Sequence, residues 1–225
     1  MNYQIWGENL PAVTITLQKG ESIFTQSGGM TWMNDRFKME TGVKGGIAKG
    51  LGRMFTGESL FMASYTATED GAQFTASSAF PGKILAFEIG EGKELVAQKG
   101  AFLCATEGVV ISTAFSGVKA GFLGGDGFIL QRFSGEGTVF LEIDGSVECI
   151  DLAPGEKYKV NTGNVALFES SVQYSAEMVK GFKNVLFGGE GLFLSTVTGP
   201  GKVWLQTRSA RELAARIGGY IAAKK

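Results

Sequence analysis

The sequence contains no histidine among its 225 residues and only two cysteines. Without histidine, the chain cannot build a Ser-His-Asp or Cys-His nucleophile system or use a histidine general base. A structural zinc site would also lack ligands. We therefore expect a protein that is not an enzyme, with no catalytic residues, no cofactor and no bound metal. Cys104 and Cys149 lie in apolar, strand-like runs, so we expect both to be buried, while their pairing stays open.

The chain also lacks a strong net charge and a long apolar run. Its net charge is −1 and its pI is near 5.7, so no overall attraction to nucleic acid is built in. No apolar run approaches the roughly 20 residues that a membrane-spanning helix needs. The first residues show neither the basic nor the apolar region of a signal peptide. We expect a cytoplasmic protein that does not bind nucleic acid.

Glycine is abundant, with 34 residues spread along the whole chain. Many of these glycines recur in one pattern that occurs three times, which indicates an internal repeat. Three pairs share a spacing of eight residues: Gly20 and Gly28, Gly100 and Gly108, Gly155 and Gly163. Later in each unit, Gly71, Gly137 and Gly201 open similar short apolar runs. The repeats run over about 10–80, 85–146 and 147–208.

Short runs of alternating or apolar residues predict strands. Residues 13–17 alternate in the manner of a half-buried strand, and so do residues 138–143, with both faces partly apolar. The pair Asp144-Gly145 then predicts a two-residue hairpin to residues 147–150. Close spacing of short strands and glycine turns favours an all-β fold. We expect one domain over 1–208, made of three β-sandwich-like units around a pseudo-threefold axis.

The last residues break the β pattern. Ser209 and Glu212 have the spacing of a capping box, which predicts the start of a helix. The apolar residues that follow fall on one helical face: Leu213, Ile217, Tyr220 and Ile221. We expect a short amphipathic helix over 209–225 that packs on the β domain.

An acidic residue recurs in the second block of each repeat: Glu58, Asp126 and Glu190. If the repeats surround an axis, the three carboxylates can converge on a small ligand or a hard cation. The alternative is that an acidic residue suits a glycine-rich turn before a strand. Both interpretations stay open at this point.

Residues 43–55 form a second segment that breaks the β pattern. Lys44, Lys49 and Arg53 accompany apolar residues at helical spacing, which is typical of contact with a membrane surface. The four glycines in the segment weaken any helix, so a solvated insertion between two strands is the alternative.

Six segments resemble signature motifs of the AIM24 family, and they occur in order over nearly the whole chain. These segments are Gly57–Phe61, Ala79–Ile84, Gly100–Leu103, Val160–Phe168, Gly188–Phe193 and Thr198–Gln206. The resemblance implies a compact all-β fold related to the tryptophan RNA-binding attenuator protein (TRAP-like) fold. It implies no catalytic residue. Mitochondrial members are associated with inner-membrane organisation, and this chain resembles the bacterial and archaeal members.

These observations favour a non-enzymatic binding or scaffold protein that acts through contacts with protein or with a membrane surface. Its protein partners are not identified by the sequence, and exposed strand edges favour a homo-oligomer. The first alternative is a regulator that binds a small ligand or metal through the repeated carboxylates. The second is nucleic-acid binding by analogy with the TRAP-like fold, which the acidic pI disfavours.

Overall fold

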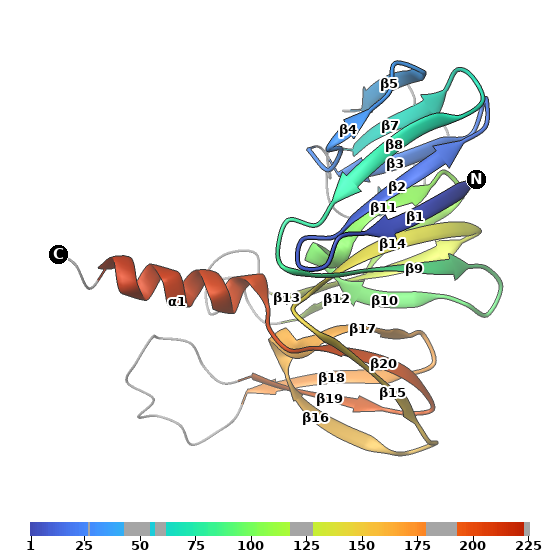
Figure 1. Ribbon diagram of the computed structural model, residues 1–225. Coiled ribbons are helices and arrows are strands. Elements are labelled where there is room, and N and C mark those ends of the chain that lie inside the picture. Colours follow the sequence, from blue (N-terminus) through green and yellow to red (C-terminus); the bar gives the residue numbers. More distant parts are fainter. Residues whose placement is uncertain (27, 43–54, 57–61, 118–127, 179–192, 223–225) are drawn as a thin grey trace.

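The computed structural model describes residues 1–26, 28–42, 55–56, 62–117, 128–178 and 193–222. The described chain consists of β-strands with one α-helix, α1 (Ala210–Ala222), at its C-terminal end. The all-β class with a short C-terminal helix is therefore confirmed. Four sheets carry the strands, and Figure 1 shows strands of the first half of the chain at the top and the last strands at the bottom.

The sheet nearest the N-terminus, which we call the N-terminal end sheet, has four antiparallel strands. Their order is β1 (Asn2–Trp6), β2 (Ala12–Leu17), β8 (Ala72–Ser77) and β4 (Trp32–Met33). The predicted alternation over 13–17 is confirmed, because Val13, Ile15 and Leu17 are buried while the two threonines between them are partly exposed. This sheet therefore buries one face only.

Two larger sheets form the middle of the molecule. The six-stranded sheet has the order β5 (Phe37–Gly42), β7 (Met62–Ala67), β3 (Ser22–Gln26), β11 (Phe102–Thr106), β14 (Gly137–Asp144), β9 (Gly82–Ile89). The seven-stranded sheet has the order β15 (Val147–Leu152), β20 (Gly201–Gln206), β17 (Val165–Glu169), β10 (Leu95–Gln98), β13 (Phe128–Gly135), β12 (Val109–Gly117), β6 (Phe55–Thr56).

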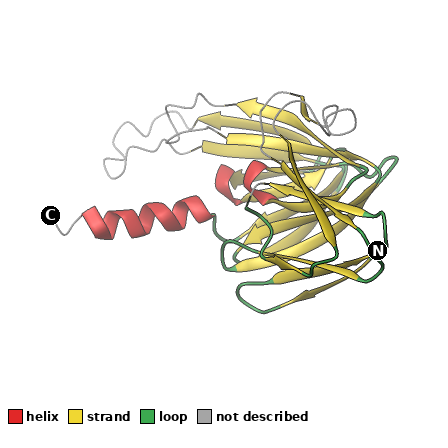
Figure 2. Cartoon of the chain, turned by 90° about the horizontal axis from the view of Figure 1, so that it is seen from above, coloured by secondary structure: helices red, strands yellow, loops and turns green. Residues whose placement is uncertain are grey.

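The last sheet, which we call the C-terminal end sheet, has three antiparallel strands. Their order is β16 (Lys157–Asn161), β19 (Phe193–Thr198) and β18 (Gln173–Met178). Two short 3-10 turns, η2 (Lys99–Ala101) and η3 (Thr162–Asn164), lead into β11 and β17. Figure 2 shows α1 extending sideways from the strands.

Three hydrophobic cores join these sheets in series. The first contains Phe74 of the N-terminal end sheet with Ile23 and Phe140 of the six-stranded sheet. The second lies between the two middle sheets, and the third between the seven-stranded sheet and the C-terminal end sheet. Strand β3 supplies Ile23 to the first core and its neighbour Phe24 to the second. The middle strands are therefore apolar on both faces, as predicted for residues 138–143.

The predicted hairpin at Asp144-Gly145 is wrong. Gly145 has the positive φ of 71° that a tight turn requires, but the two strands that flank it do not pair with each other. Strand β14 pairs with β9 and β11, whereas β15 pairs with β20 of the other middle sheet. The turn therefore carries the chain from one sheet to the next, because burial of both faces of β14 outweighs the local hairpin preference.

The glycines that open the last strand of each predicted repeat have a common backbone conformation. Gly71, Gly137 and Gly201 all have positive φ, and β8, β14 and β20 start at or directly after them. A Cβ atom on Gly137 would lie 2.1 Å from Oγ1 of Thr106, so a side chain has no room there. The threefold repeat, its pseudo-threefold arrangement and the TRAP-like relation stay predictions.

The two cysteines are free, and they lie in different surroundings. Cys104 is buried in the first core, where burial raises the pKa of its thiol. Cys149 lies on the edge strand β15 and is exposed. The expectation that both are buried is therefore correct for Cys104 and wrong for Cys149, because an edge strand leaves one side open.

Candidate functional surfaces

The site residues predicted from the sequence lie outside the described residues. This applies to the three carboxylates of Glu58, Asp126 and Glu190, and to the basic residues Lys44, Lys49 and Arg53. Their convergence and their contact with a membrane stay predictions. The described residues instead present three other surfaces: one face of the N-terminal end sheet, a junction of carboxylates, and the exposed side of α1.

The outward face of the N-terminal end sheet, which we call the neutral face, carries no ionisable side chain. The four strands β1, β2, β8 and β4 contain no Asp, Glu, Lys or Arg at all. Strand register places three rows of side chains across the face, because residues in register point the same way. The rows are Trp6, Ala12 and Ser77; Gln4, Thr14, Thr75 and Trp32; and Asn2, Thr16 and Gln73.

Two tryptophans dominate the neutral face. Trp6 and Trp32 belong to the two edge strands, yet their ring centroids are only 6.0 Å apart, at an interplanar angle of 36°. The indoles remain 42% and 52% exposed, so both ring systems are open to solvent. Thr14 and Thr75 occupy the two strands between them, and Thr75 is buried. Small side chains in the middle of the sheet therefore let the two indoles approach each other.

Hydroxyl groups of the neutral face are joined to one another and to an indole. The Trp6 Nε1–H donates to Oγ1 of Thr14 over 3.0 Å, and this oxygen is 3.0 Å from Oγ1 of Thr75. At one end of the face, Oγ1 of Thr31 lies 2.8 Å from Oγ of Ser77. These bonds hold the indole of Trp6 in a defined position. The face thus combines exposed aromatic rings with ordered neutral hydrogen-bonding groups.

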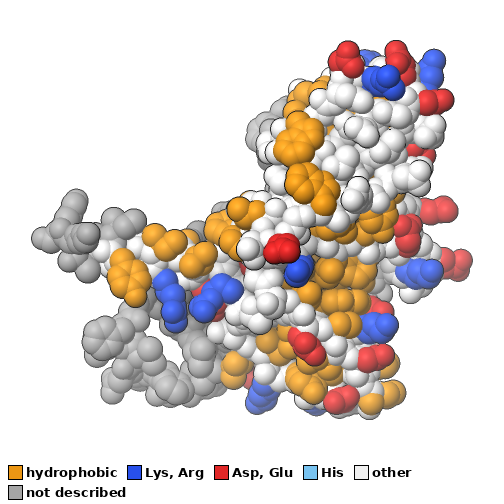
Figure 3. Space-filling view, viewed as in Figure 1, with side chains coloured by type: hydrophobic (Ala, Val, Ile, Leu, Met, Phe, Trp, Pro, Cys, Tyr) orange, Lys and Arg blue, Asp and Glu red, His pale blue; other side chains and the backbone are white. Residues whose placement is uncertain are grey.

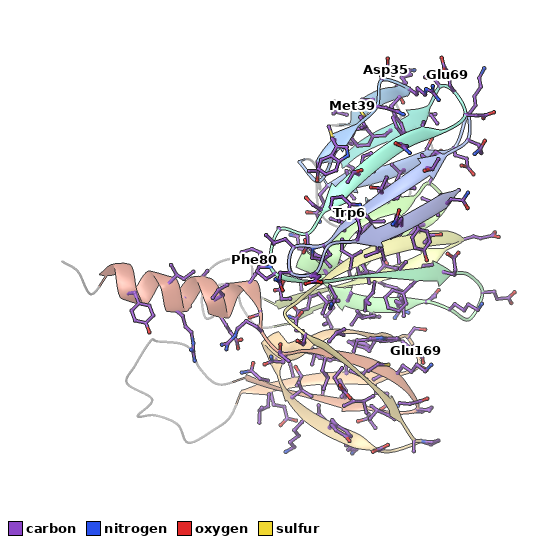
Figure 4. All side chains as sticks on the ribbon, in the orientation of Figure 1. Trp6, Asp35, Met39, Glu69, Phe80 and Glu169 are labelled. Atoms are coloured by element: carbon purple, nitrogen blue, oxygen red, sulfur yellow. The ribbon has the colours of Figure 1, made fainter. Side chains whose placement is uncertain are left out.

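The figures place this surface on the upper part of the molecule. Figure 4 labels Trp6 on the front of the upper sheets. In Figure 3 the front of the upper part is mostly white, with a few orange side chains, and the red and blue side chains gather at its upper and right margins. Two of the residues at the upper end, Asp35 and Glu69, are labelled in Figure 4. The neutral face is therefore a patch without charge whose margins carry charged side chains.

The second surface is a junction of two carboxylates on β14. Glu142 and Asp144 are two residues apart on this strand, so they lie on the same face. Glu142 accepts hydrogen bonds from Oγ of Ser78 over 2.8 Å and from the backbone N–H of Ala79 over 2.9 Å. Burial raises the pKa of Glu142, and the nearby charge of Asp144 adds to this, while the two hydrogen bonds act in the opposite direction.

Asp144 connects the junction to the C-terminal helix. Its carboxylate accepts a hydrogen bond from the backbone N–H of Ala210, the first residue of α1. Burial raises the pKa of Asp144, and this hydrogen bond partly offsets the effect. Its backbone N–H donates to Oε1 of Gln206, and the N–H of Gly145 donates to the carbonyl of Pro81. The end of β14, the 78–82 turn and the start of α1 are therefore tied together.

The predicted capping box is confirmed at the start of α1. The backbone N–H of Glu212 donates to Oγ of Ser209 over 3.2 Å, and the N–H of Ser209 donates to the Glu212 carboxylate over 3.4 Å. Two backbone N–H groups at the start of the helix, which have no partner within the helical ladder, thus gain hydrogen-bond acceptors. A further donor is satisfied by Asp144, so the start of α1 is well anchored.

The third surface is the apolar side of α1, which the sheets do not bury. The side chains of Ile217 and Tyr220 are 51% and 78% exposed, and Figure 1 shows the helix projecting away from the strands. Only the first turn, with Leu213, is partly buried. The expected packing of this face on the β domain is therefore not found for Ile217 and Tyr220. Arg208 and Arg216 are exposed on the same segment.

No helix in the described part of the chain is long and apolar enough to span a membrane. Within the same residues, no group of three or more cysteine and acidic side chains is arranged to hold a metal ion.

Sequence reasoning missed the residues that define these surfaces. Trp6 and Trp32 are 26 positions apart, and only the strand order of the sheet brings them together. The lack of charge in residues 1–7 is a local signal, but it does not reveal a shared face. The sequence predicts Asp144 only as a turn residue, because its contact with the helix depends on the crossover between sheets.

The fold is shared with a solved structure. An X-ray crystal structure of a Streptococcus pyogenes protein, solved by a structural genomics consortium, matches with a TM-score of 0.78. The match covers 97% of this chain and 99% of that chain, at 22% sequence identity. This likeness defines the class: an all-β protein whose fold extends over nearly the whole length of both chains.

The family follows from the sequence comparison. Residues 3–208 match the family model described as "Mitochondrial biogenesis AIM24", so the chain belongs to the AIM24 family. An uncharacterized protein of Streptococcus pyogenes serotype M6 is 28% identical over 219 residues, covering 94% of this chain and 87% of that protein. The resemblance seen in the sequence motifs is thus confirmed. The helix α1 begins after the residues that the family model covers.

Proposed function

We propose that this AIM24-family protein is a non-enzymatic binding or scaffold protein, and that α1 attaches it peripherally to an anionic membrane surface. The observation that carries the proposal is the exposure of Ile217 and Tyr220 on a helix that is anchored at its start. A helix that exposes an apolar face to water gains free energy when that face enters the boundary between lipid headgroups and acyl chains. Tyrosine is favoured at this boundary.

The charge of the segment supports an anionic surface as the occupant. Residues 209–225 contain four basic residues and a single acidic one, Glu212, which the capping box uses. Arg216 lies one turn from both Leu213 and Tyr220, so its charged end can reach the headgroups beside the apolar face. A protein groove is the competing occupant, but it does not require this excess of positive charge.

Vesicle co-sedimentation tests the proposal. We expect the protein to sediment with vesicles that contain phosphatidylglycerol and to stay in solution with phosphatidylcholine alone. The double substitution Ile217→Ser with Tyr220→Ser removes the apolar face and abolishes sedimentation. Ala215→Ser is the matched control, because this exposed residue points to the opposite side of α1 and its change leaves binding intact.

Two further measurements keep the result interpretable. Far-UV circular dichroism of each variant reports whether the helix and the sheets persist. If the double variant and the wild type sediment equally, α1 is not the contact and the proposal fails. The sequence predicts residues 43–55 as a second membrane contact. Charge reversal at Lys44, Lys49 and Arg53 tests this contact separately.

The regulator that uses Glu58, Asp126 and Glu190 stays the alternative from the sequence. Native mass spectrometry of the protein as purified distinguishes the two. A bound metal or metabolite favours the regulator, and a mass without any adduct favours the scaffold.

A further inference from the structure

We propose that the neutral face of the N-terminal end sheet is a binding site for a neutral glycan chain, with the indoles of Trp6 and Trp32 as the stacking surface. The site is separate from α1 and from the carboxylate junction. It consists of the two indoles and the rows of hydroxyl and amide side chains beside them.

The aromatic part of the argument is the convergence of the two indoles. Single exposed aromatic residues are normal on protein surfaces and need no explanation. Here, two indoles extend from opposite edges of one sheet to a centroid separation of 6.0 Å, and each remains about half exposed. The indole face presents negative partial charge, and the C–H groups on a sugar ring face present positive partial charge. Two adjacent indoles thus offer a broad surface on which sugar rings can stack.

The polar part of the argument is the chemistry of the surrounding rows. Gln4, Gln73 and Asn2 are exposed and carry amides, which both donate and accept hydrogen bonds. Thr16 and Ser77 add partly exposed hydroxyls. Sugar hydroxyls also donate and accept, so they can pair with each of these groups. The hydroxyl contacts of Thr14 with Trp6 and Thr75 order the centre of the site before any ligand arrives.

The lack of charge selects against other ligand classes. Nucleic acids and phosphate groups are bound largely through lysine and arginine, and the four strands of this sheet carry neither. A second copy of the chain would bury the hydroxyl and amide groups, which costs free energy unless each finds a partner. A neutral polyhydroxylated chain meets both the aromatic and the polar requirements of the face.

Binding of neutral oligosaccharides to the full-length protein tests the proposal. Maltoheptaose, cellohexaose and mannohexaose are titrated while tryptophan emission and heat are recorded. We expect at least one of them to bind and to change the emission, with no loss of affinity at high salt. Trp32→Ala should weaken this binding by about tenfold, which corresponds to the loss of one stacking contact. Gln73→Ala should weaken it while leaving both indoles in place.

Tyr158→Ala is the matched control, since Tyr158 is an aromatic residue exposed by 39% on the C-terminal end sheet. The Tyr158→Ala variant should bind the same oligosaccharide with the affinity of the wild type. Thermal denaturation of each variant shows whether it is folded. Trp32 and Gln73 are exposed, so both variants are expected to fold.

Four outcomes overturn the proposal. The first is that none of the three oligosaccharides binds. The second is that binding persists unchanged in both Trp32→Ala and Gln73→Ala. The third is that salt abolishes binding, which indicates a charged site elsewhere. The fourth is that Trp32→Ala changes the oligomeric state in analytical ultracentrifugation without affecting any oligosaccharide, which identifies the neutral face as a contact between copies.

Discussion

The two end sheets are built alike but present different chemistry to solvent. Each buries apolar residues on its inward face, with Phe74 at one end of the molecule and Val197 at the other. On the outward face, the C-terminal end sheet carries exposed Lys157, Lys159 and Glu177, whereas the N-terminal end sheet carries no charge. Packing therefore determines the inward faces, and the outward faces are free to differ in function.

The largest loss of stability is expected in the apolar cores beneath the two end sheets, where the two ends are alike. Phe74→Ala on the N-terminal end sheet removes a buried ring whose centroid lies 4.9 Å from that of Tyr65. Phe168→Ala on β17 removes a buried ring that stacks on Tyr174 of the C-terminal end sheet, at 5.5 Å between centroids. Each substitution should lower the free energy of unfolding by about 3–5 kcal/mol, because it leaves a cavity. Chemical denaturation measures both. A loss below about 1 kcal/mol for one variant would show that the core beneath that end sheet is not part of the cooperative unit.

A smaller difference in stability is expected between substitutions on the two outward faces. Thr75→Val removes the hydroxyl that contacts Thr14 beneath the two indoles, and it should cost about 1 kcal/mol. Lys159→Ala on the other end sheet removes an exposed side chain and should change stability by less than about 0.5 kcal/mol. Denaturant midpoints of the two variants provide the measurement. Equal values would mean that the neutral face is no more ordered than an ordinary solvated surface.

The stability of the protein should depend on pH through the carboxylate junction, which lies between the two end sheets. The pKa values of Glu142 and Asp144 are raised in the folded protein, chiefly by burial. The folded state therefore binds protons more tightly than the unfolded state, so these groups favour folding at low pH. Their contribution is lost as the pH rises from the ordinary carboxyl pKa through the raised value. Glu142→Gln should flatten the dependence of the melting temperature on pH in this range, and an unchanged slope would contradict the assignment.

Local patterns in the sequence predicted the elements better than their partners. The alternation over 13–17 and the capping box at Ser209 depend on residues close in sequence, and both are confirmed. The hairpin at Asp144-Gly145 failed because the turn signal does not specify which sheet the next strand joins. The helix was predicted correctly, but the exposure of Ile217 depends on where the chain leaves the sheets.

The candidate surfaces were less predictable than the fold. The repeat pattern predicts a site at Glu58, Asp126 and Glu190, which lie outside the described residues. The neutral face has no motif, since Trp6 and Trp32 meet only through the order of four strands. Long-range strand order is set by the burial of whole sheets, and a single sequence carries little direct information about it.

The alternation within β3 has a consequence for how the protein melts. Ile23 and Phe24 belong to different cores, as do Phe140 and Leu141 on β14. A strand that leaves one core must also leave the other. On β10, Ala97 and Val96 likewise belong to the second and third cores, so the three cores cannot dissolve separately. We expect a single heat-absorption peak in calorimetry, with equal calorimetric and van't Hoff enthalpies, although the described residues form three distinct cores.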